Sequence, residues 1–131
     1  MWPARCKLIA MNWTDILIAA AIVAAFLIYM RSGLVSVKDA QAYLKNGAMV
    51  IDVRTAGEFV AHHLPIAVNL PVSEIETNLD RRVKDKNQVL LLHCQSGARS
   101  GAAKKKLIAL GCPNVFNMGS YARAERIVSG K

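Results

Sequence analysis

The most informative stretch of this sequence reads His93-Cys94-Gln95-Ser96-Gly97-Ala98-Arg99-Ser100, with one cysteine between two different patterns. Before it, residues 89–92 form a short apolar run typical of a buried strand, and after it, residues 100–110 are rich in Ala, Lys and Leu, as in a helix. Cys94 is therefore expected in a strand-to-helix turn. Backbone N–H groups without helical acceptors converge in such a turn and favour a thiolate.

The number of residues between Cys94 and Arg99 separates two chemistries. Protein tyrosine phosphatases carry a similar string, but their loop is one residue longer and is wide enough to seat a phosphate. The four residues 95–98 of this chain draw the N–H donors into a smaller ring, which fits the terminal sulfur of a persulfide better than a tetrahedral phosphate. The spacing therefore indicates sulfur transfer, with a small phosphatase or arsenate reductase as an alternative.

Further motifs lie on both sides of this loop. They are Ile51-Asp52-Val53-Arg54, Glu58-Phe59, His63-Leu64-Pro65, Ala67-Val68-Asn69-Leu70-Pro71 and Asn114-Val115-Phe116-Asn117-Met118-Gly119-Ser120-Tyr121. Together they resemble a single-domain rhodanese over roughly residues 36–127. The resemblance implies an α/β fold of three layers, with a parallel β-sheet flanked by helices. It also implies transfer of a sulfane sulfur from a donor such as thiosulfate to cyanide or a thiol through a Cys94 persulfide, without metal or organic cofactor.

The expected site gathers residues from two strand ends. Cys94 is the expected nucleophile, and the loop expected to offer backbone donors to its sulfur comprises Gln95, Ser96, Gly97, Ala98 and Arg99. Arg99 has two interpretations: it holds a donor's sulfonate by paired hydrogen bonds, or it braces the loop against Glu58. Asp52 and Arg54 are expected either to orient the loop from below or to be structural hydrogen-bonding groups.

Two residues depart from the family pattern, because His62 and Ile66 stand where the family usually has glycine. If these positions need positive φ, a side chain costs about 1 kcal/mol or more, and the loop beside the site is displaced. This departure favours a rival function, a binding or regulatory module without turnover. His93 should point to the sheet face opposite Cys94, and His63 takes the family's histidine place near the site.

The chain is expected to divide into an N-terminal tail (residues 1–12), a membrane helix (13–31), a linker (32–36) and the rhodanese-like domain (37–131). Strands are expected at residues 48–53, 67–70, 88–93 and 115–117, and helices at 36–46, 58–61, 73–79, 100–110 and 122–128. Ser36 and Ser73 are the expected helix caps. Alternating strands and helices imply a parallel sheet covered on both faces.

The segment from Ile16 to Met30 has no charged or strongly polar side chain. As a helix, its fifteen residues span about 22 Å, short of the roughly 30 Å hydrocarbon core, and Trp13, Tyr29 and Arg31 supply the difference as interfacial residues. We therefore expect one helix anchored in membrane lipid, with a signal peptide or an apolar packing helix as alternatives.

The membrane side does not follow from the basic residues, since two precede this helix and two follow it closely. If synthesis begins at Met11 rather than Met1, the charge distribution favours the cytoplasm. A persulfide also survives more easily among reduced thiols. We therefore expect a protein of the cell (inner) membrane with a cytoplasmic domain, and a periplasmic domain is the alternative.

The net charge of +8 invites comparison with nucleic-acid-binding proteins. The basic runs at residues 81–86 and 104–106 have no interleaved aromatic residues, so we interpret them as solvated faces and expect no nucleic-acid partner. The cysteines and histidines show neither a disulfide framework nor a metal-ligand spacing. The expected partners are small sulfur compounds such as thiosulfate and thiols, or a protein thiol acceptor.

Overall fold

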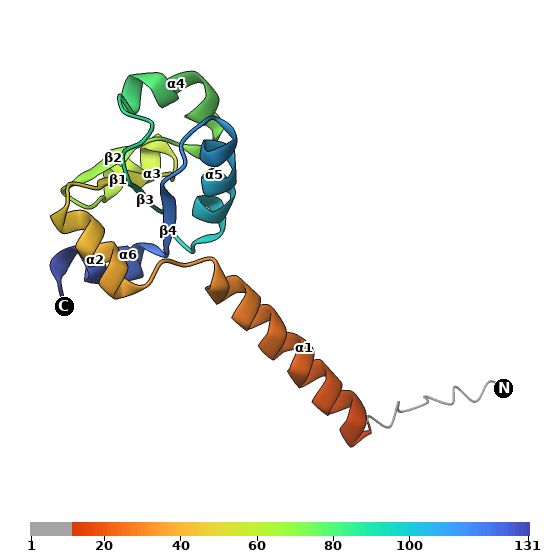
Figure 1. Ribbon diagram of the computed structural model, residues 1–131. Coiled ribbons are helices and arrows are strands. Elements are labelled where there is room, and N and C mark those ends of the chain that lie inside the picture. The colour runs from red at the N-terminus through yellow and green to blue at the C-terminus, as the bar shows by residue number, and fades with distance from the viewer. Residues whose placement is uncertain (1–11) are drawn as a thin grey trace. The chain divides into compact units, whose positions relative to one another are not determined.

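The computed structural model describes residues 12–131 and divides the chain into two compact units, residues 1–32 and 33–131. Figure 1 labels the α-helices and strands. In the first unit the described part consists of the single helix α1 (Trp13–Ser32). The predicted tail before Asn12 and the choice between Met1 and Met11 as the start lie outside the described residues.

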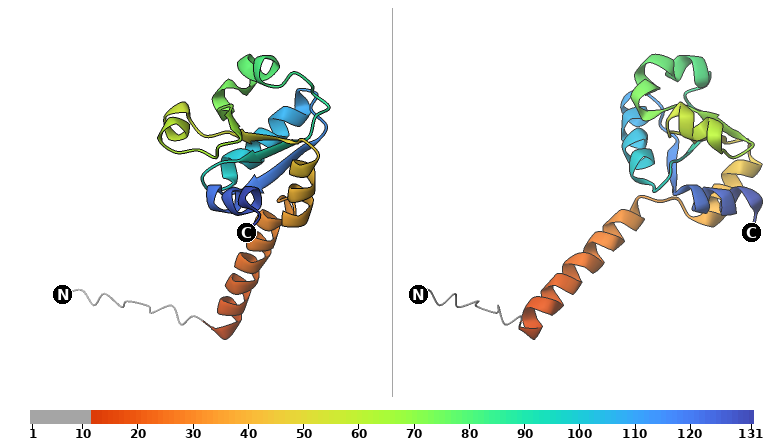
Figure 2. Two further views of the ribbon diagram at one scale, coloured as in Figure 1. Left: turned by 90° about the vertical axis from the view of Figure 1, so that its left-hand side faces the viewer. Right: turned by 180° about the vertical axis from the view of Figure 1, so that it is seen from behind.

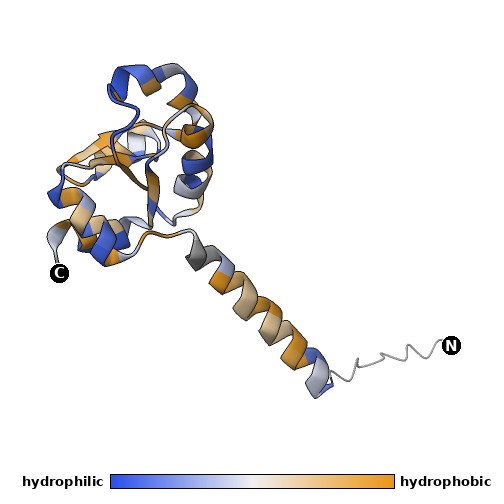
Figure 3. Cartoon of the chain, in the orientation of Figure 1, coloured by the Kyte–Doolittle hydropathy of each residue, from blue (hydrophilic) through white to orange (hydrophobic). Residues whose placement is uncertain are grey.

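Helix α1 occupies the segment that was predicted to cross a membrane, and it is apolar along most of its length (Figure 3). Nevertheless, none of the helices within residues 12–131 combines the length and the apolar character that crossing requires. The predicted membrane anchor is therefore not supported.

The second unit alternates helices and strands along the chain. Its elements are α2 (Val37–Lys45), β1 (Met49–Asp52), α3 (Ala56–Ala61), β2 (Ala67–Asn69), the 3-10 turn η1 (Val72–Glu74), α4 (Ile75–Arg82), β3 (Leu90–His93), α5 (Ala98–Ala109), β4 (Val115–Gly119) and α6 (Tyr121–Ser129). The strands form one sheet in the order β2-β1-β3-β4, and every neighbouring pair is parallel. This confirms the parallel sheet expected from the alternation.

Helices cover both faces of the sheet, as the turned views in Figure 2 show. On one face, Leu90 and Leu92 of β3 pack with the apolar side chains of α4 and α5. On the other face, Leu91 packs with those of α2 and α6. Because successive side chains of a strand point to opposite faces, the continuous apolar run of β3 serves both cores. The three-layer α/β arrangement is thus confirmed.

Two predicted helix starts differ from the structure. Ser73 was expected to cap a helix, but it lies inside η1, and α4 begins at Ile75 with no side-chain cap. Pro71 immediately precedes η1, and its fixed φ suits the start of such a tight turn. The helix predicted from residue 100 instead begins at Ala98, because Gly97 adopts a φ of 98° and ends the turn two residues earlier.

Candidate active site

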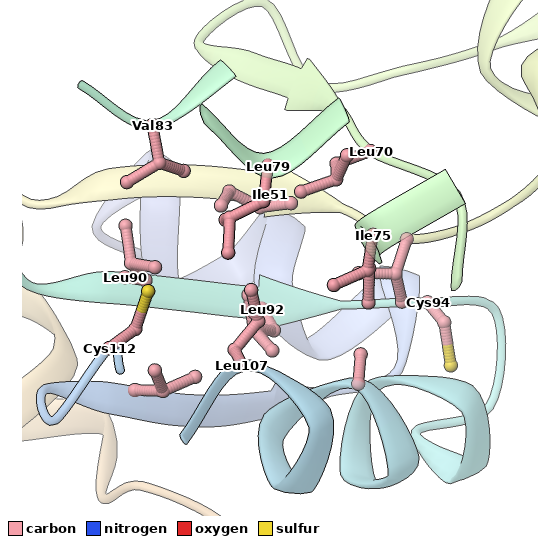
Figure 4. Close-up of a cluster of buried hydrophobic side chains, with 13 residues drawn as sticks. Ile51, Leu70, Ile75, Leu79, Val83, Leu90, Leu92, Cys94, Leu107 and Cys112 are labelled. Carbon is pink, nitrogen blue, oxygen red and sulfur yellow. The ribbon is translucent and has the colours of Figure 1, made fainter. Parts of the chain in front are cut away.

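Cys94 follows the last residue of β3, and the turn that leads into α5 comprises residues 95–97. Figure 4 shows Cys94 at one end of an apolar cluster, with Cys112 at the opposite end. Both thiols are buried and free of disulfides. The expected strand-to-helix turn is present. Because the two cysteines lie at opposite ends of the cluster, their side chains have different neighbours.

The sulfur of Cys94 lies among donors of the following turn. The N–H of Gly97 donates to Sγ at 3.0 Å, and the hydroxyl of Ser100 lies 3.6 Å from Sγ. Burial raises the pKa of the thiol, but hydrogen bonds from Ser100 and from the N–H groups of Gly97 and Ser96 more than offset it. The pKa of Cys94 therefore lies below its ordinary value, which favours the thiolate.

The turn is fastened to the junction of β4 and α6 by its backbone. The N–H of Cys94 donates to the carbonyl of Gly119 at 3.2 Å, and the N–H of Tyr121 donates to the carbonyl of Gln95 at 3.3 Å. Between these contacts, Ser96 pairs with Ser120 in an isolated antiparallel bridge. These contacts hold the turn against a second, separate segment of the chain.

Gly97 is required where the turn and β4 approach each other most closely. Its φ of 98° is left-handed, and a Cβ at this position would lie 3.2 Å from the Cα of Gly119. A side chain would therefore meet both backbone strain and a contact with main-chain atoms that have little freedom to move. This geometry agrees with the expectation from the sequence that Gly97 permits the tight turn.

Arg99 forms a two-pronged ion pair with Glu58 of α3. Its Nη1 lies 2.7 Å from Oε2 and its Nη2 lies 2.9 Å from Oε1. This hydrogen bonding, together with hydrogen bonds from the backbone and hydroxyl of Thr55, lowers the pKa of Glu58 to about 2. Of the two interpretations of Arg99, the bracing contact is the one present in this structure.

Arg54 and Asp52 form a buried pair at the carboxyl end of β1. The guanidinium Nη2 lies 2.7 Å from Oδ2 of Asp52, whose side chain is completely buried. Arg54 also donates to the carbonyl of His62 at 2.6 Å and to Oε1 of Gln95 at 3.5 Å, and it lies 4.8 Å from the ring centroid of Tyr121. Arg54 thus links α3, the cysteine turn and α6, while Asp52 holds Arg54 in place.

His93 lies in the interior with neither ring nitrogen hydrogen-bonded. Its ring meets Tyr121 edge-on at 5.7 Å, in the layer between the sheet and α6, so it faces away from the sulfur of Cys94 as expected. Burial lowers the pKa of His93, although Asp52 at 3.9 Å acts in the opposite direction. Burial therefore favours the neutral form of the ring.

The two residues at family glycine positions adopt ordinary backbone conformations. His62 has a φ of −165°, which is extended, and within residues 12–131 no residue other than glycine has a positive φ. The condition for strain at His62 and Ile66, a positive φ, is therefore not met. His62 tilts against Tyr121 at 4.9 Å, Ile66 is exposed, and the neighbouring His63 stacks on Phe59 at 4.0 Å.

Two buried residues of the site, Ser100 and Asn117, were not among the residues expected from the sequence. Asn117 of β4 accepts a hydrogen bond from the hydroxyl of Ser100 at 2.8 Å, and the same hydroxyl lies 3.6 Å from the sulfur of Cys94. A bulge between β3 and β4 pairs Leu92 with Asn117 but His93 with Gly119. This register could not be read from the sequence, although a polar residue within an apolar strand was a visible signal.

Comparison with known proteins gives a consistent result. A family model described as "Rhodanese-like domain" matches residues 36–123. Thiosulfate sulfurtransferase PspE of Escherichia coli (strain K12) is 35% identical over 69 residues, which cover 53% of this chain and 66% of that protein, just under two thirds. The uncharacterized protein YqhL of Bacillus subtilis (strain 168) is 32% identical over 110 residues, which cover 78% of this chain and 86% of that protein.

Solved structures agree with these sequence matches. The human single-domain sulfurtransferase TSTD1 superimposes with a TM-score of 0.63 at 28% identity, covering 72% of this chain and 96% of that structure. A rhodanese with anions from E. coli superimposes with a TM-score of 0.56 at 31% identity, covering 59% of this chain and 91% of that structure.

Proposed function

This chain belongs to the rhodanese-like domain family, and from that premise we propose that it transfers a sulfane sulfur through a persulfide on Cys94. The observation that carries the proposal is the Cys94 turn, where hydrogen bonds from Gly97 and Ser100 lower the pKa of a buried thiol. Relatives described as thiosulfate sulfurtransferases support the reaction class.

The proposed reaction has two halves. In the first, the Cys94 thiolate attacks the outer sulfur of thiosulfate, a new S–S bond forms, and the original S–S bond breaks with its electron pair leaving on sulfite. In the second, cyanide or a thiolate attacks the terminal sulfur of the persulfide. Thiocyanate or an acceptor persulfide is released, and the bonding pair returns to Cys94 as the thiolate.

The turn is suited to hold the charge at both stages. N–H groups of Ser96 and Gly97 and the start of α5 stabilise the thiolate before transfer. In the persulfide, the negative charge moves to the outer sulfur, and we propose that the same ring of donors from Gln95 to Arg99 surrounds it. Asp52 and Arg54 would support the turn through the contact between Arg54 and Gln95.

Access to the sulfur involves Arg99. Cys94 has no exposed surface, and Arg99 interacts electrostatically with Cys94 as well as with Glu58. We propose that an anionic donor draws the guanidinium away from Glu58, so that the same residue braces the empty site and binds the donor's sulfonate. The two interpretations of Arg99 that the sequence allowed then describe the same residue before and after the donor binds.

The proposed reaction also indicates which classes of compound act as sulfur donor and acceptor. We propose a small sulfur compound such as thiosulfate as donor, and a small thiol or a protein thiol as acceptor. A reducing compartment would preserve the persulfide, so we continue to predict that the domain lies in the cytoplasm. A tag-accessibility measurement on intact cells tests it, and protection of the tag until the cells are opened is the expected result.

The rival of a binding module without turnover was favoured by strain at His62 and Ile66. Because His62 has an extended backbone and no positive φ occurs outside glycine within residues 12–131, that support is removed. The phosphatase alternative is tested by turnover of an aryl phosphate. Appreciable hydrolysis that depends on Cys94 would replace the sulfur-transfer proposal.

Mass measurement of the intact protein after thiosulfate treatment tests the main proposal. We expect a gain of about 32 Da, one sulfur atom, that is lost on later addition of cyanide. A Cys94→Ser variant should not gain mass, whereas a Cys112→Ser variant should gain it fully, because Cys112 is buried at the far end of the apolar cluster (Figure 4). Absence of the added sulfur in the wild-type protein would refute the function.

A further inference from the structure

The hydroxyl of Ser100 has a single hydrogen and three acceptors within reach. Its Oγ lies 2.8 Å from Oδ1 of Asn117, 3.0 Å from the carbonyl oxygen of Gly97 and 3.6 Å from Sγ of Cys94. Ser100 is completely buried. Because one hydroxyl donates one hydrogen, these three contacts cannot all be donated hydrogen bonds at the same moment.

The carboxamide of Asn117 has a determined orientation. The N–H of Gly119 donates to Oδ1 at 2.8 Å, so the oxygen, not the amide nitrogen, faces that N–H and the hydroxyl of Ser100. On its other side, Nδ2 donates to the carbonyl of Gly97 at 3.4 Å. Asn117 is nearly buried, and its carbonyl is therefore a fixed acceptor placed beside the hydroxyl.

We propose that Asn117 is a positioning residue that competes with the sulfur of Cys94 for the hydroxyl hydrogen of Ser100. Its distance to Oγ is the shortest of the three, so the hydroxyl rests on Asn117 while the sulfur is neutral. When the sulfur becomes a thiolate, it is the stronger acceptor, and the hydroxyl turns towards it. The rotation breaks no covalent bond and moves no proton between groups.

For turnover, this inference rests on the proposed persulfide reaction. The free thiolate carries its charge on Sγ and attracts the hydroxyl of Ser100. Once the outer sulfur has been accepted, the charge lies one atom further out, and the hydroxyl returns to Asn117. The hydroxyl thus stabilises the leaving thiolate when the persulfide is discharged, and Asn117 takes the hydrogen when the sulfur no longer needs it.

The experiment measures the pKa of the Cys94 thiol from the pH dependence of its alkylation by iodoacetamide. The variants are Asn117→Ala, Ser100→Ala and the double substitution, in a background that carries both Cys6→Ser and Cys112→Ser, so that Cys94 is the one thiol that reports. We expect Ser100→Ala to raise the thiol pKa by about one unit and Asn117→Ala to lower it by about half a unit. In the double variant the pKa should equal that of Ser100→Ala alone.

The double substitution separates competition from a general structural role. The charged and titratable groups around the turn are Arg99, Glu58, Arg54, Asp52 and His93, and they are the same in all four proteins, so their effects cancel in the comparison. If Asn117→Ala shifts the pKa equally with and without Ser100, or raises it, the proposal is overturned. A structural loosening would act in both backgrounds.

A second variant covers the case that Asn117→Ala does not fold, since the N–H of Gly119 would lose its acceptor. Asn117→Asp keeps the shape and the acceptor oxygen, and it binds the hydroxyl more strongly. We expect it to raise the thiol pKa more in the presence of Ser100 than in Ser100→Ala. Equal rises would contradict the competition. Alkylation requires no sulfur donor, so a failure of sulfur transfer leaves this test valid.

Discussion

The turn at Cys94 and the short helix α3 lie next to each other, yet they are held in opposite ways. The turn is joined to the β4–α6 junction by backbone hydrogen bonds, and the cysteine itself is buried. Helix α3 has no buried residue and is held through the ion pair of Glu58 and the hydrogen bond from Arg54 to its C-cap residue, His62. The comparison indicates a rigid centre for the chemistry and a rim that depends on charged side chains.

The largest effect is expected where one side chain supports both regions. Arg54→Leu removes the contacts with His62 and Gln95 and leaves the carboxylate of Asp52 buried without its partner. We expect a loss of about 3 kcal/mol in the free energy of unfolding, because a buried charge without a partner is strongly unfavourable. Denaturant unfolding measures this, and exposed Arg81→Leu serves as the control. A loss no greater than in the control would show that the pair does not support the fold.

Alanine in place of a glycine should distinguish the two regions directly. In the turn, Gly97→Ala meets a left-handed φ and a main-chain contact at 3.2 Å, so we expect a loss of about 1 to 2 kcal/mol and slower sulfur loading. In α3, Gly57→Ala meets no atom within 4 Å and should be neutral or stabilising by up to about 1 kcal/mol. Thermal unfolding measures the stability of both variants, and the mass of the protein after thiosulfate treatment measures sulfur loading. Equal effects of the two substitutions would contradict the difference between the turn and α3.

A smaller effect is expected when the rim is loosened without touching the turn. Glu58→Gln removes the charge that holds Arg99 and frees the guanidinium for an anionic donor. We expect the KM for thiosulfate to fall by a few-fold, with a smaller change for a neutral donor, while the pH profile of Cys94 alkylation changes little. Thr77→Ala, at an exposed position of α4, is the control. A higher KM would indicate that Glu58 positions Arg99 for the donor instead of competing for it.

The smallest effect concerns acid stability. The pKa of Glu58 is lowered to about 2 in the fold, from an ordinary value of 4.5. Its contribution to stability is therefore present above pH 4.5 and is lost as the pH falls towards 2. Because about a third of the Glu58 side chain is open to solvent (35%), water screens the ion pair and the contribution is modest. Unfolding of wild type and Glu58→Gln across this window should converge as the pH falls, and parallel curves would contradict the assignment.

The central turn could be predicted from the sequence because its determinants are local. The apolar run of β3, the glycine at position 97 and the following helix are adjacent in the chain, so they place Cys94 without knowledge of distant contacts. The parallel sheet followed for the same reason, from the alternation of strands and helices.

What the sequence did not reveal depends on contacts between distant segments. The contact of Asn117 with Ser100 requires the register of β4 and its bulge, and the link from Arg54 to Gln95 joins residues 41 positions apart. Strain at His62 was expected from a glycine pattern, but the local path of the chain allows an extended φ. The prediction of a membrane helix counted Trp13, Tyr29 and Arg31 at the ends of the apolar run towards the length needed to cross a membrane.

The junction between the turn and residues 119–121 has a consequence for biogenesis. A nascent chain that has not yet supplied Gly119 and Tyr121 lacks the partners that fasten Cys94 and Gln95. Its thiol would then behave like that of an unfolded peptide, with an ordinary acidity and no protection from oxidants. The rise of a fast-reacting thiol during refolding should therefore mark the last stage of maturation.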